Sequence, residues 1–258
     1  MADFFNKTKE LSGAARFRLS EIAKDLFFSR KKVWCRSACL GKEVFTLVYG
    51  EKNYKLVNMQ KARVDLLLNW ITGRAQRPKA SAVKPYMKRS DVYPFIKEQT
   101  KLPWPRANED FEFLLMDSYS ELTDQKFNDK IQGWSFCCHW SDINHESDFD
   151  SRFACDGLLP ADQFRPAYQN FFSWFFEIYP EKNVYFMHYP SKLDEKEKFK
   201  QRGAAILEAI LELAIEYPQI KNLSVPEELV DYNESDRLPY HYSKKTNYAM
   251  AAVWRAQI

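Results

Sequence analysis

The sequence lacks the glycine-rich motifs that mark several large classes of α/β enzyme. Its seven glycines form no GxGxxG, no GxxxxGK[ST] and no GxSxG. The first two motifs bring the backbone close to phosphate groups, and the third carries the nucleophile of many α/β-hydrolases. Their absence argues against a dinucleotide enzyme, a P-loop protein and a typical α/β-hydrolase.

The sequence also has no hydrophobic run long enough to cross a bilayer. The longest, residues 204–215, is interrupted by two glutamates at helical spacing, which indicates an amphipathic or core helix. The amino-terminal region contains no apolar stretch of signal-peptide length, because it is interrupted at Asp3, Glu10, Glu21 and Asp25. We therefore expect neither an integral membrane span nor a signal peptide.

Cysteine is scarce and odd in number. The chain has five cysteines, and two of them, Cys137 and Cys138, are adjacent. This pattern does not fit a disulfide framework in a chain of this length. We therefore predict a reducing, cytoplasmic location.

The net charge of +3 is too small to require nucleic acid or an anionic membrane as a partner, but its distribution is uneven. Residues 72–106 carry nine Lys or Arg against two acidic residues, whereas residues 109–163 carry thirteen Asp or Glu against three basic residues. The two segments are either solvated faces that pair with each other or include a dedicated anion-binding surface. Because residues 72–106 also contain five prolines, we expect them to be mostly loop, with one short helix near 92–98, and to cover the active site.

The rest of the chain alternates short apolar runs with amphipathic segments. Residues 6–28 have the spacing of an amphipathic helix, which would serve as core packing, a lid, a dimer contact or a peripheral membrane helix. From residue 31 onward, strands and helices alternate in the way that is typical of a three-layer α/β/α sandwich around a mainly parallel sheet. We predict an amino-terminal helix over 1–30 and a single α/β domain over 31–258. The expected strands begin near residue 31 and lie at 54–58, 111–116, 134–140, 183–187 and 223–225; the expected helices lie at 41–49, 61–71, 161–179, 193–217 and from 245 onward.

The segment from Lys31 to Phe45 places Cys39 between the first strand and the first helix of this domain. Loops at the carboxyl ends of parallel strands border the ligand crevice. A cysteine there lies at the positive end of a helix dipole, which favours the thiolate, and Arg36 and Lys42 would act in the same direction. The alternative is that Cys39 is a small buried residue that fills the corner.

Other polar residues follow later strands and would converge on the same edge of the sheet. His241 would be the general base for Cys39, with Asp236 or Asp231 orienting its imidazole, and His188 is the competing base. Asp117 and Ser118 would bind an oxyanion or a substrate hydroxyl, or they would cap the helix that follows.

We expect no metal site. Cys137 and Cys138 lie next to His139, but adjacent strand residues point to opposite faces and do not easily share one ion. His145 lies among acidic residues, yet their spacing fits no metal-binding loop.

Three short motifs resemble one family. The run from Ser37 to Glu43, SACLGKE, resembles the Gly-Ser-Cys-Val-Ser-Arg-Asp opening of a bacterial group related to the SGNH (GDSL-like) hydrolases. The strand that ends at Asp117, with Glu121 and Leu122 after it, is similar to the second motif of that group, and residues 239–243, PYHYS, are similar to its histidine motif. The resemblance implies a flavodoxin-like sandwich in which Cys39 takes the place of the nucleophilic serine and His241 that of the base. Ser37 and Asp117 would then lie at the substrate.

The resemblance also implies an activity, because this superfamily includes esterases and O-acyltransferases that act on cell-surface polysaccharides. Our first hypothesis is an enzyme that forms a thioester at Cys39, with His241 as general acid/base and the amides of residues 38–40 as oxyanion donors. Its partner would be a carbohydrate in bacterial surface-polysaccharide biosynthesis, and the implied acyl donor would be a molecule such as acetyl-CoA. The second hypothesis is a non-catalytic SGNH-like module that binds a carbohydrate or a partner enzyme. The opening motif favours it, because Ser37 and Ala38 replace the glycine and serine of the family pattern.

Overall fold

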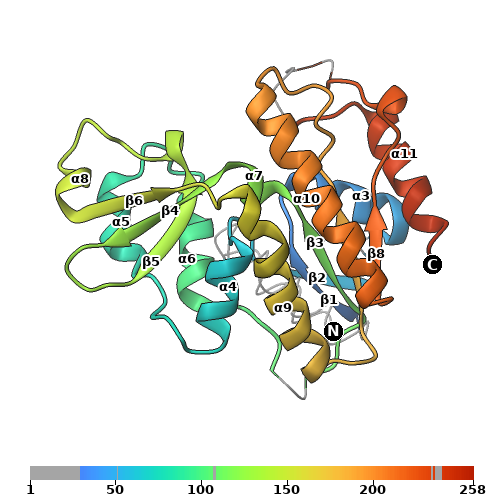
Figure 1. The fold of residues 1–258 in the computed structure, drawn as a ribbon, viewed down its shortest axis with the longest axis horizontal. Helices are drawn as coiled ribbons and strands as arrows, with labels where there is room; N and C mark the ends of the chain where they lie inside the picture. The colour runs from blue at the N-terminus through green and yellow to red at the C-terminus, as the bar shows by residue number, and fades with distance from the viewer. Residues whose placement is uncertain (1–29, 51, 107–108, 234, 236–239) are drawn as a thin grey trace, which may run out of the picture.

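The computed structural model of the protein describes residues 30–50, 52–106, 109–233, 235 and 240–258 (Figure 1). The amphipathic helix expected over residues 6–28 lies outside the described residues. None of the helices that the described residues form is both long and apolar enough to cross a membrane.

A five-stranded parallel sheet forms the centre of the molecule. Its strands stand in the order β2-β1-β3-β7-β8, and every neighbouring pair is parallel. This is the 2-1-3-4-5 order of flavodoxin-like folds, in which ligands bind at the carboxyl edge between the first and third strands. The bounds of the strands are β1 Lys31–Arg36, β2 Tyr54–Asn58, β3 Phe113–Asp117, β7 Asn183–Met187 and β8 Ile220–Leu223.

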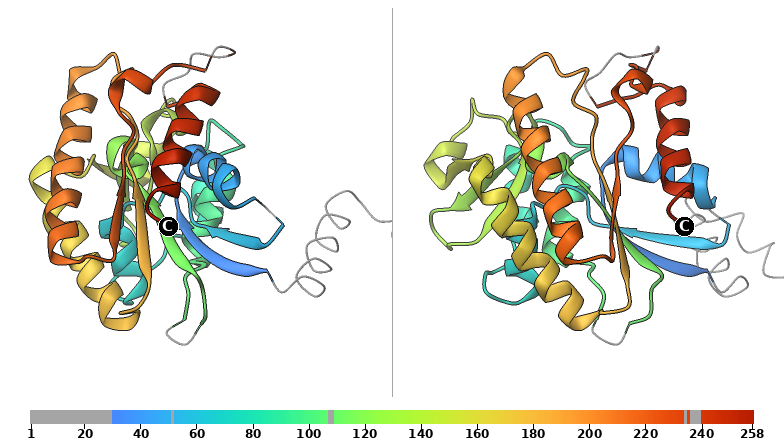
Figure 2. Two further views of the ribbon diagram at one scale, coloured as in Figure 1. Left: turned by 90° about the vertical axis from the view of Figure 1, so that its right-hand side faces the viewer. Right: turned by 45° about the vertical axis from the view of Figure 1, so that its right-hand side comes forward.

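Helices cover both faces of this sheet, which confirms the three-layer sandwich (Figure 2). Alternate strand residues point to opposite faces. Tyr185 of β7 packs on Trp254 of α11, with ring centroids 5.2 Å apart, whereas the next residue, Phe186, packs on Tyr168 of α9 at 5.2 Å. One layer therefore contains α3 Cys39–Tyr49 and α11 Lys244–Arg255, and the other contains α4 Val64–Ile71, α9 Phe164–Ile178 and α10 Glu197–Glu216.

A second, antiparallel sheet of order β5-β4-β6 lies beside the sandwich, at the left of Figure 1. The apolar run at 134–140 forms β5, so the expectation that it joins the main sheet is wrong. The sheet has its own hydrophobic cluster, which includes Phe127, Trp134 and Phe136. The remaining elements here are β4 Asp124–Asp129, β5 Ser135–His139, β6 Phe153–Gly157, α7 Tyr119–Thr123 and α8 Phe149–Arg152.

Residues 72–106 pack against this second sheet. They form α5 Ala80–Val83 and α6 Tyr93–Lys101, and Val83 and Ile96 are fully buried in its cluster. The expected short helix near 92–98 is confirmed as α6, but the expectation that this segment covers the active site is wrong. These residues are held by apolar contacts with a sheet that the sequence pattern did not predict.

A buried cation joins the two sheets. Lys61 is 6% exposed, and its ammonium group lies 3.3 Å from Asp124 and 3.1 Å from Asp142, both of which are fully buried. The Lys61 carbonyl accepts a hydrogen bond from Gln99 Nε2 on α6 at 2.6 Å. Removing one partner of such a pair leaves an uncompensated buried charge, so this contact fixes the second sheet against the first.

Candidate active site

Cys39 is exposed and is the first residue of α3, at the carboxyl end of β1. The helix begins at Cys39 and not at Gly41 as the sequence suggested. Because β2 and β3 flank β1 on opposite sides, this loop lies at the topological switch point of the sheet. Cys39 therefore does not fill a buried corner, and its thiol faces a site where this class of fold binds ligands.

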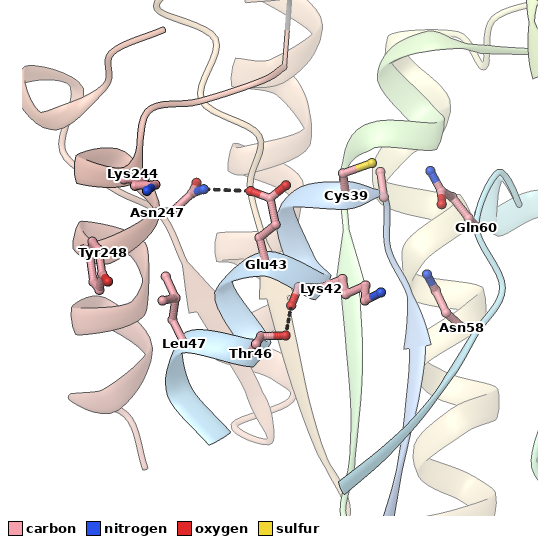
Figure 3. A pocket seen from close by; sticks show the side chains of 11 residues that line it. Cys39, Lys42, Glu43, Thr46, Leu47, Asn58, Gln60, Lys244, Asn247 and Tyr248 are labelled. Atoms are coloured by element: carbon pink, nitrogen blue, oxygen red, sulfur yellow. Dashed lines mark hydrogen bonds between the residues drawn. The ribbon is translucent and has the colours of Figure 1, made fainter. Parts of the chain in front are cut away.

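A pocket of about 570 Å³ opens in front of Cys39 (Figure 3). Its walls come from α3, from the end of β2 and from α11, which lies beside α3. The side chain of Glu43, one turn after Cys39, accepts a hydrogen bond from Asn247 Nδ2 of α11 at 2.7 Å. The pocket is lined by Ala38, Cys39, Lys42, Glu43, Thr46, Leu47, Asn58, Gln60, Lys244, Asn247 and Tyr248.

A second, much smaller cavity of about 30 Å³ brings Cys39 and His241 together. Cys39, Glu43 and His241 all line it, although the first and last of these are two hundred residues apart in the chain. The structure thus gathers Cys39, Glu43 and His241 around a space that would hold about one water molecule.

The structure describes one of the two residues that were expected to orient His241. Asp236 lies outside the described residues, so its contact with His241 stays a prediction. Asp231, the alternative, pairs with Lys245 at 3.3 Å.

Asp117 and Ser37 build the turn that carries Cys39. Asp117 Oδ2 accepts hydrogen bonds from Ser37 Oγ and from the Ala38 amide, both at 2.7 Å, and its Oδ1 accepts from the Tyr119 amide at 3.0 Å. Burial raises the pKa of Asp117, while Arg36 and these hydrogen bonds oppose the rise. Asp117 and Ser37 are buried and line neither cavity, so the expectation that they contact substrate is not supported and a supporting role replaces it.

Gly41 is needed where α3 crosses Ser37. A Cβ atom at Gly41 would lie 1.8 Å from Ser37 Oγ and 2.8 Å from Ser37 Cβ. Asn58 fixes Ser37 from the other side, because its side chain accepts from the Ser37 amide at 3.1 Å and donates to the Ser37 carbonyl at 2.8 Å. The close approach holds the first turn of α3, and hence Cys39, against the sheet.

Two of the three amides expected to form an oxyanion hole are already engaged. The Ala38 amide donates to Asp117, and the Leu40 amide donates to the Tyr189 hydroxyl at 3.2 Å. The expectation that residues 38–40 offer three donors is therefore wrong. Of these three, the Cys39 amide alone is left for a developing oxyanion.

The expectation that nearby cations favour the thiolate is also wrong. Burial raises the pKa of the Cys39 thiol, and the charges of Glu43 and Asp117 raise it further, against a smaller lowering effect of Lys61. Arg36 does not help, because its guanidinium is buried and donates to Glu121 at 2.5–3.0 Å and to the Asp117 carbonyl at 3.1 Å. Cys39 is therefore predominantly a thiol at neutral pH.

His188 does not face Cys39. It follows Phe186 by two positions and packs on its ring at 4.9 Å, on the α9 side of the sheet. Burial lowers the pKa of His188 to about 4, so the ring is neutral at pH 7. The residue after it, Tyr189, reaches α3 instead, because its hydroxyl accepts a hydrogen bond from the Leu40 amide. Ser118 Oγ accepts a hydrogen bond from the Tyr189 amide at 3.0 Å. His188 is therefore not placed to act as the base for Cys39. Ser118 lines neither cavity, and its side chain does not cap the helix that follows.

The described residues contain no group of three or more His, Cys, Asp or Glu side chains that would hold a metal ion. Cys137 belongs to the main core cluster and Cys138 to that of the second sheet, because the two side chains point to opposite faces. The His145 ring stacks on Trp140 with centroids 3.7 Å apart.

Sequence analysis missed three residues that shape the site: Glu43, Asn247 and Tyr189. Glu43 has a readable signal, because residues four apart on a helix share a face and Glu43 is four residues after Cys39. Asn247 and Tyr189 come from distant segments, and no local pattern marks them.

Comparisons with known proteins give little more. No family model matches the sequence, and the comparison with curated proteins found no match. Among solved structures, an acetyl xylan esterase from the rumen bacterium Butyrivibrio proteoclasticus aligns with a TM-score of 0.39 and 10% sequence identity. The alignment covers 89% of this chain and 63% of that chain, so the protein spans less than two thirds of the esterase.

Proposed function

We propose that the protein is an SGNH-like acyl-transfer enzyme that carries the acyl group on Cys39 and passes it to a hydroxyl group of a carbohydrate or to water. The observation that carries this proposal is that the exposed Cys39 and His241 line one cavity at the switch point of the sheet. A nucleophile and a base brought together from distant parts of a chain are the core of such sites.

The chemistry follows from the raised pKa of Cys39. Because the thiol is protonated at rest, His241 removes its proton as sulfur attacks the acyl carbonyl. The bond between the carbonyl and the leaving group then breaks, and the leaving group takes the proton from His241. In the second half, His241 deprotonates the acceptor hydroxyl, which attacks the thioester and releases the Cys39 thiol.

The larger pocket supports a substrate of moderate size. Its volume of about 570 Å³ lies in the range of small-molecule sites, and its lining is rich in amide, hydroxyl and charged side chains that suit a sugar. We propose a carbohydrate acceptor in surface-polysaccharide biosynthesis and an acyl donor of the acetyl-CoA type.

A second candidate function is a non-catalytic carbohydrate- or partner-binding module. The engaged amides of Ala38 and Leu40 and the raised pKa of the Cys39 thiol favour it. Such a module would keep the pocket and its ligand without forming a thioester.

Trapping of an acyl-enzyme separates the two candidates. The protein is incubated with acetyl-CoA or a nitrophenyl acetate and analysed by intact-mass and peptide mass spectrometry. The enzyme proposal requires one acetyl group on Cys39, its absence in Cys39→Ala and slower labelling in His241→Gln.

The matched control is Cys155→Ser, since Cys155 is the other exposed cysteine of the described residues. It should label like the wild type. Labelling of Cys39 and Cys155 at equal rates, or indifference to His241→Gln in a folded variant, would overturn the enzyme proposal and leave the binding module.

A further inference from the structure

We propose that the pocket beside Cys39 binds a ligand with an anionic group, a phosphate or a carboxylate, which Lys42 and Lys244 attract. The inference rests on the proposed function for the role of Cys39 as the reacting atom, and it names the substrate class of that site. The lysines come from two neighbouring helices, α3 and α11, that both line the pocket. In Figure 3, Lys42 extends toward Asn58, away from Lys244.

Neither lysine is neutralised within the described part of the chain. The nearby cations have partners there: Lys61 lies between two aspartates, and Lys245 pairs with Asp231 at 3.3 Å. No described carboxylate lies within salt-bridge distance of Lys42 or Lys244. A concave site with two such ammonium groups raises the local concentration of anions.

The charges that line the pocket are positive on balance. Glu43 also lines it, but its carboxylate accepts a hydrogen bond from Asn247 Nδ2 at 2.7 Å, and the two ammonium groups outnumber it. Asn247 Oδ1 accepts no hydrogen bond from the described residues, but it is fully buried and is not a contact for a ligand. An acidic or phosphorylated sugar fits such a lining.

This assignment replaces the one suggested by the charge pattern of the sequence. The basic residues of 72–106 line neither cavity that contains Cys39. The anion site therefore depends on Lys42 and Lys244, which lie outside that segment.

The test compares two aromatic disulfides of similar size as probes of Cys39. Dithiobis(nitrobenzoate) is anionic and dithiodipyridine is neutral, and both release a coloured thiol. Reactions are run in a Cys155→Ser background, since the other described cysteines, at positions 35, 137 and 138, are buried. The ratio of the two rates reports the attraction of an anion, and the neutral reagent alone reports access to a folded site.

We expect the ratio to be higher at Cys39 than at Cys155, which is measured in a Cys39→Ser background. A unit charge about 7 Å away in water changes the local concentration of an anion about threefold, so Lys42→Gln and Lys244→Gln should each lower the ratio by about that factor. The matched control is Lys198→Gln on α10, in the opposite layer, which removes the same charge and should leave the ratio unchanged.

Protection by ligands then distinguishes the sources of the anion. Inorganic phosphate or glucuronate should slow the neutral reagent at Cys39, and the more effective of the two identifies a phosphate or a carboxylate ligand; glucose should have no effect. A ratio at Cys39 no higher than at Cys155, or equal losses in Lys198→Gln and Lys42→Gln, would overturn the anion site. Because these rates do not depend on turnover, they test the anion site even if no acyl-enzyme forms.

Discussion

Replacing Gly41 by alanine should destabilise the protein, although alanine is the better helix former. The new Cβ would lie 1.8 Å from Ser37 Oγ, which is impossible without movement. Ser37 would have to give up its hydrogen bond to Asp117, and its own Cβ, at 2.8 Å, would still be too close. The backbone of β1 or α3 must therefore shift as well.

The magnitude follows from these contacts. Loss of a hydrogen bond to a buried carboxylate costs about 1.5–3 kcal/mol. Overpacking that moves backbone costs about 1–3 kcal/mol more. The higher helix propensity of alanine offsets about 1 kcal/mol, which leaves a net loss of about 1.5–5 kcal/mol for Gly41→Ala.

Urea denaturation followed by circular dichroism measures this loss. Gly203→Ala in α10 is the matched control, because its Cβ would meet no atom closer than Ser191 Cβ at 3.3 Å, and the stability should change by less than about 1 kcal/mol. In a Ser37→Gly background the clash is gone, so Gly41→Ala should cost little there and the two changes should be strongly non-additive. Additive effects, or a stable Gly41→Ala single variant, would refute the reasoning.

Three further predictions concern charge and hydrogen bonding. Burial lowers the pKa of His188 from 6.5 to about 4, so the unfolded chain binds more protons than the folded chain between these two pH values. The wild type should therefore lose about 3 kcal/mol of stability as the pH falls from 6.5 to 4. Urea denaturation at several pH values should show that His188→Gln removes this loss. Glu43→Gln should lower the pKa of the Cys39 thiol, because it removes a charge that raises it; the alkylation rate against pH would show this, and an unchanged profile would contradict it. Tyr168→Phe removes the 2.7 Å hydrogen bond to the buried Glu121 and should cost about 1.5–3 kcal/mol in urea denaturation; a cost below 0.5 kcal/mol would show that the contact adds little.

The main sheet could be predicted in large part from the sequence. Strands β1, β2, β3 and β7 lie within one or two residues of their expected places. For β3 and β7 the reason is that strands buried on both faces need continuous apolar side chains, whereas every residue of the edge strand β2 is partly exposed. Strand β4 has the sequence DQKFND and was missed. Its Asp124 and Asp129 are buried, and distant partners, Lys61 and Arg152, compensate them, so the local pattern carries no strand signal.

The prolines of residues 72–106 led to an overestimate of the loop content of this segment. Pro85 and Pro94 lie in the first turns of short helices, where the missing amide proton is not needed and the fixed φ angle is favourable. Pro85 was therefore taken as a sign of loop where it begins a short 3₁₀ helix, whereas the helix that contains Pro94 was expected.

The site was predicted in part. Cys39 could be placed from a strand-turn-helix pattern, because that pattern alone brings it to the carboxyl edge of a parallel sheet. The sequence could not show which face of the main sheet the His188 side chain lies on, because a shift of one residue along a strand moves a side chain to the other face. In the structure it is the next residue, Tyr189, that reaches α3. The sequence could not show that Arg36 has no effect on the Cys39 thiol, because its guanidinium pairs with Glu121, which is eighty-five residues away in the chain.

The hydrogen bond between Glu43 and Asn247 joins residues 204 positions apart, and this separation sets an order of events during folding. Helix α3 is synthesised about two hundred residues before α11. Until α11 docks, Cys39 has no opposite wall and no neighbouring His241, so a nascent chain presents an ordinary surface thiol. Contacts of such high sequence separation close a long loop and form late. The pocket in front of the Cys39 thiol is therefore complete only after α11 has docked on α3.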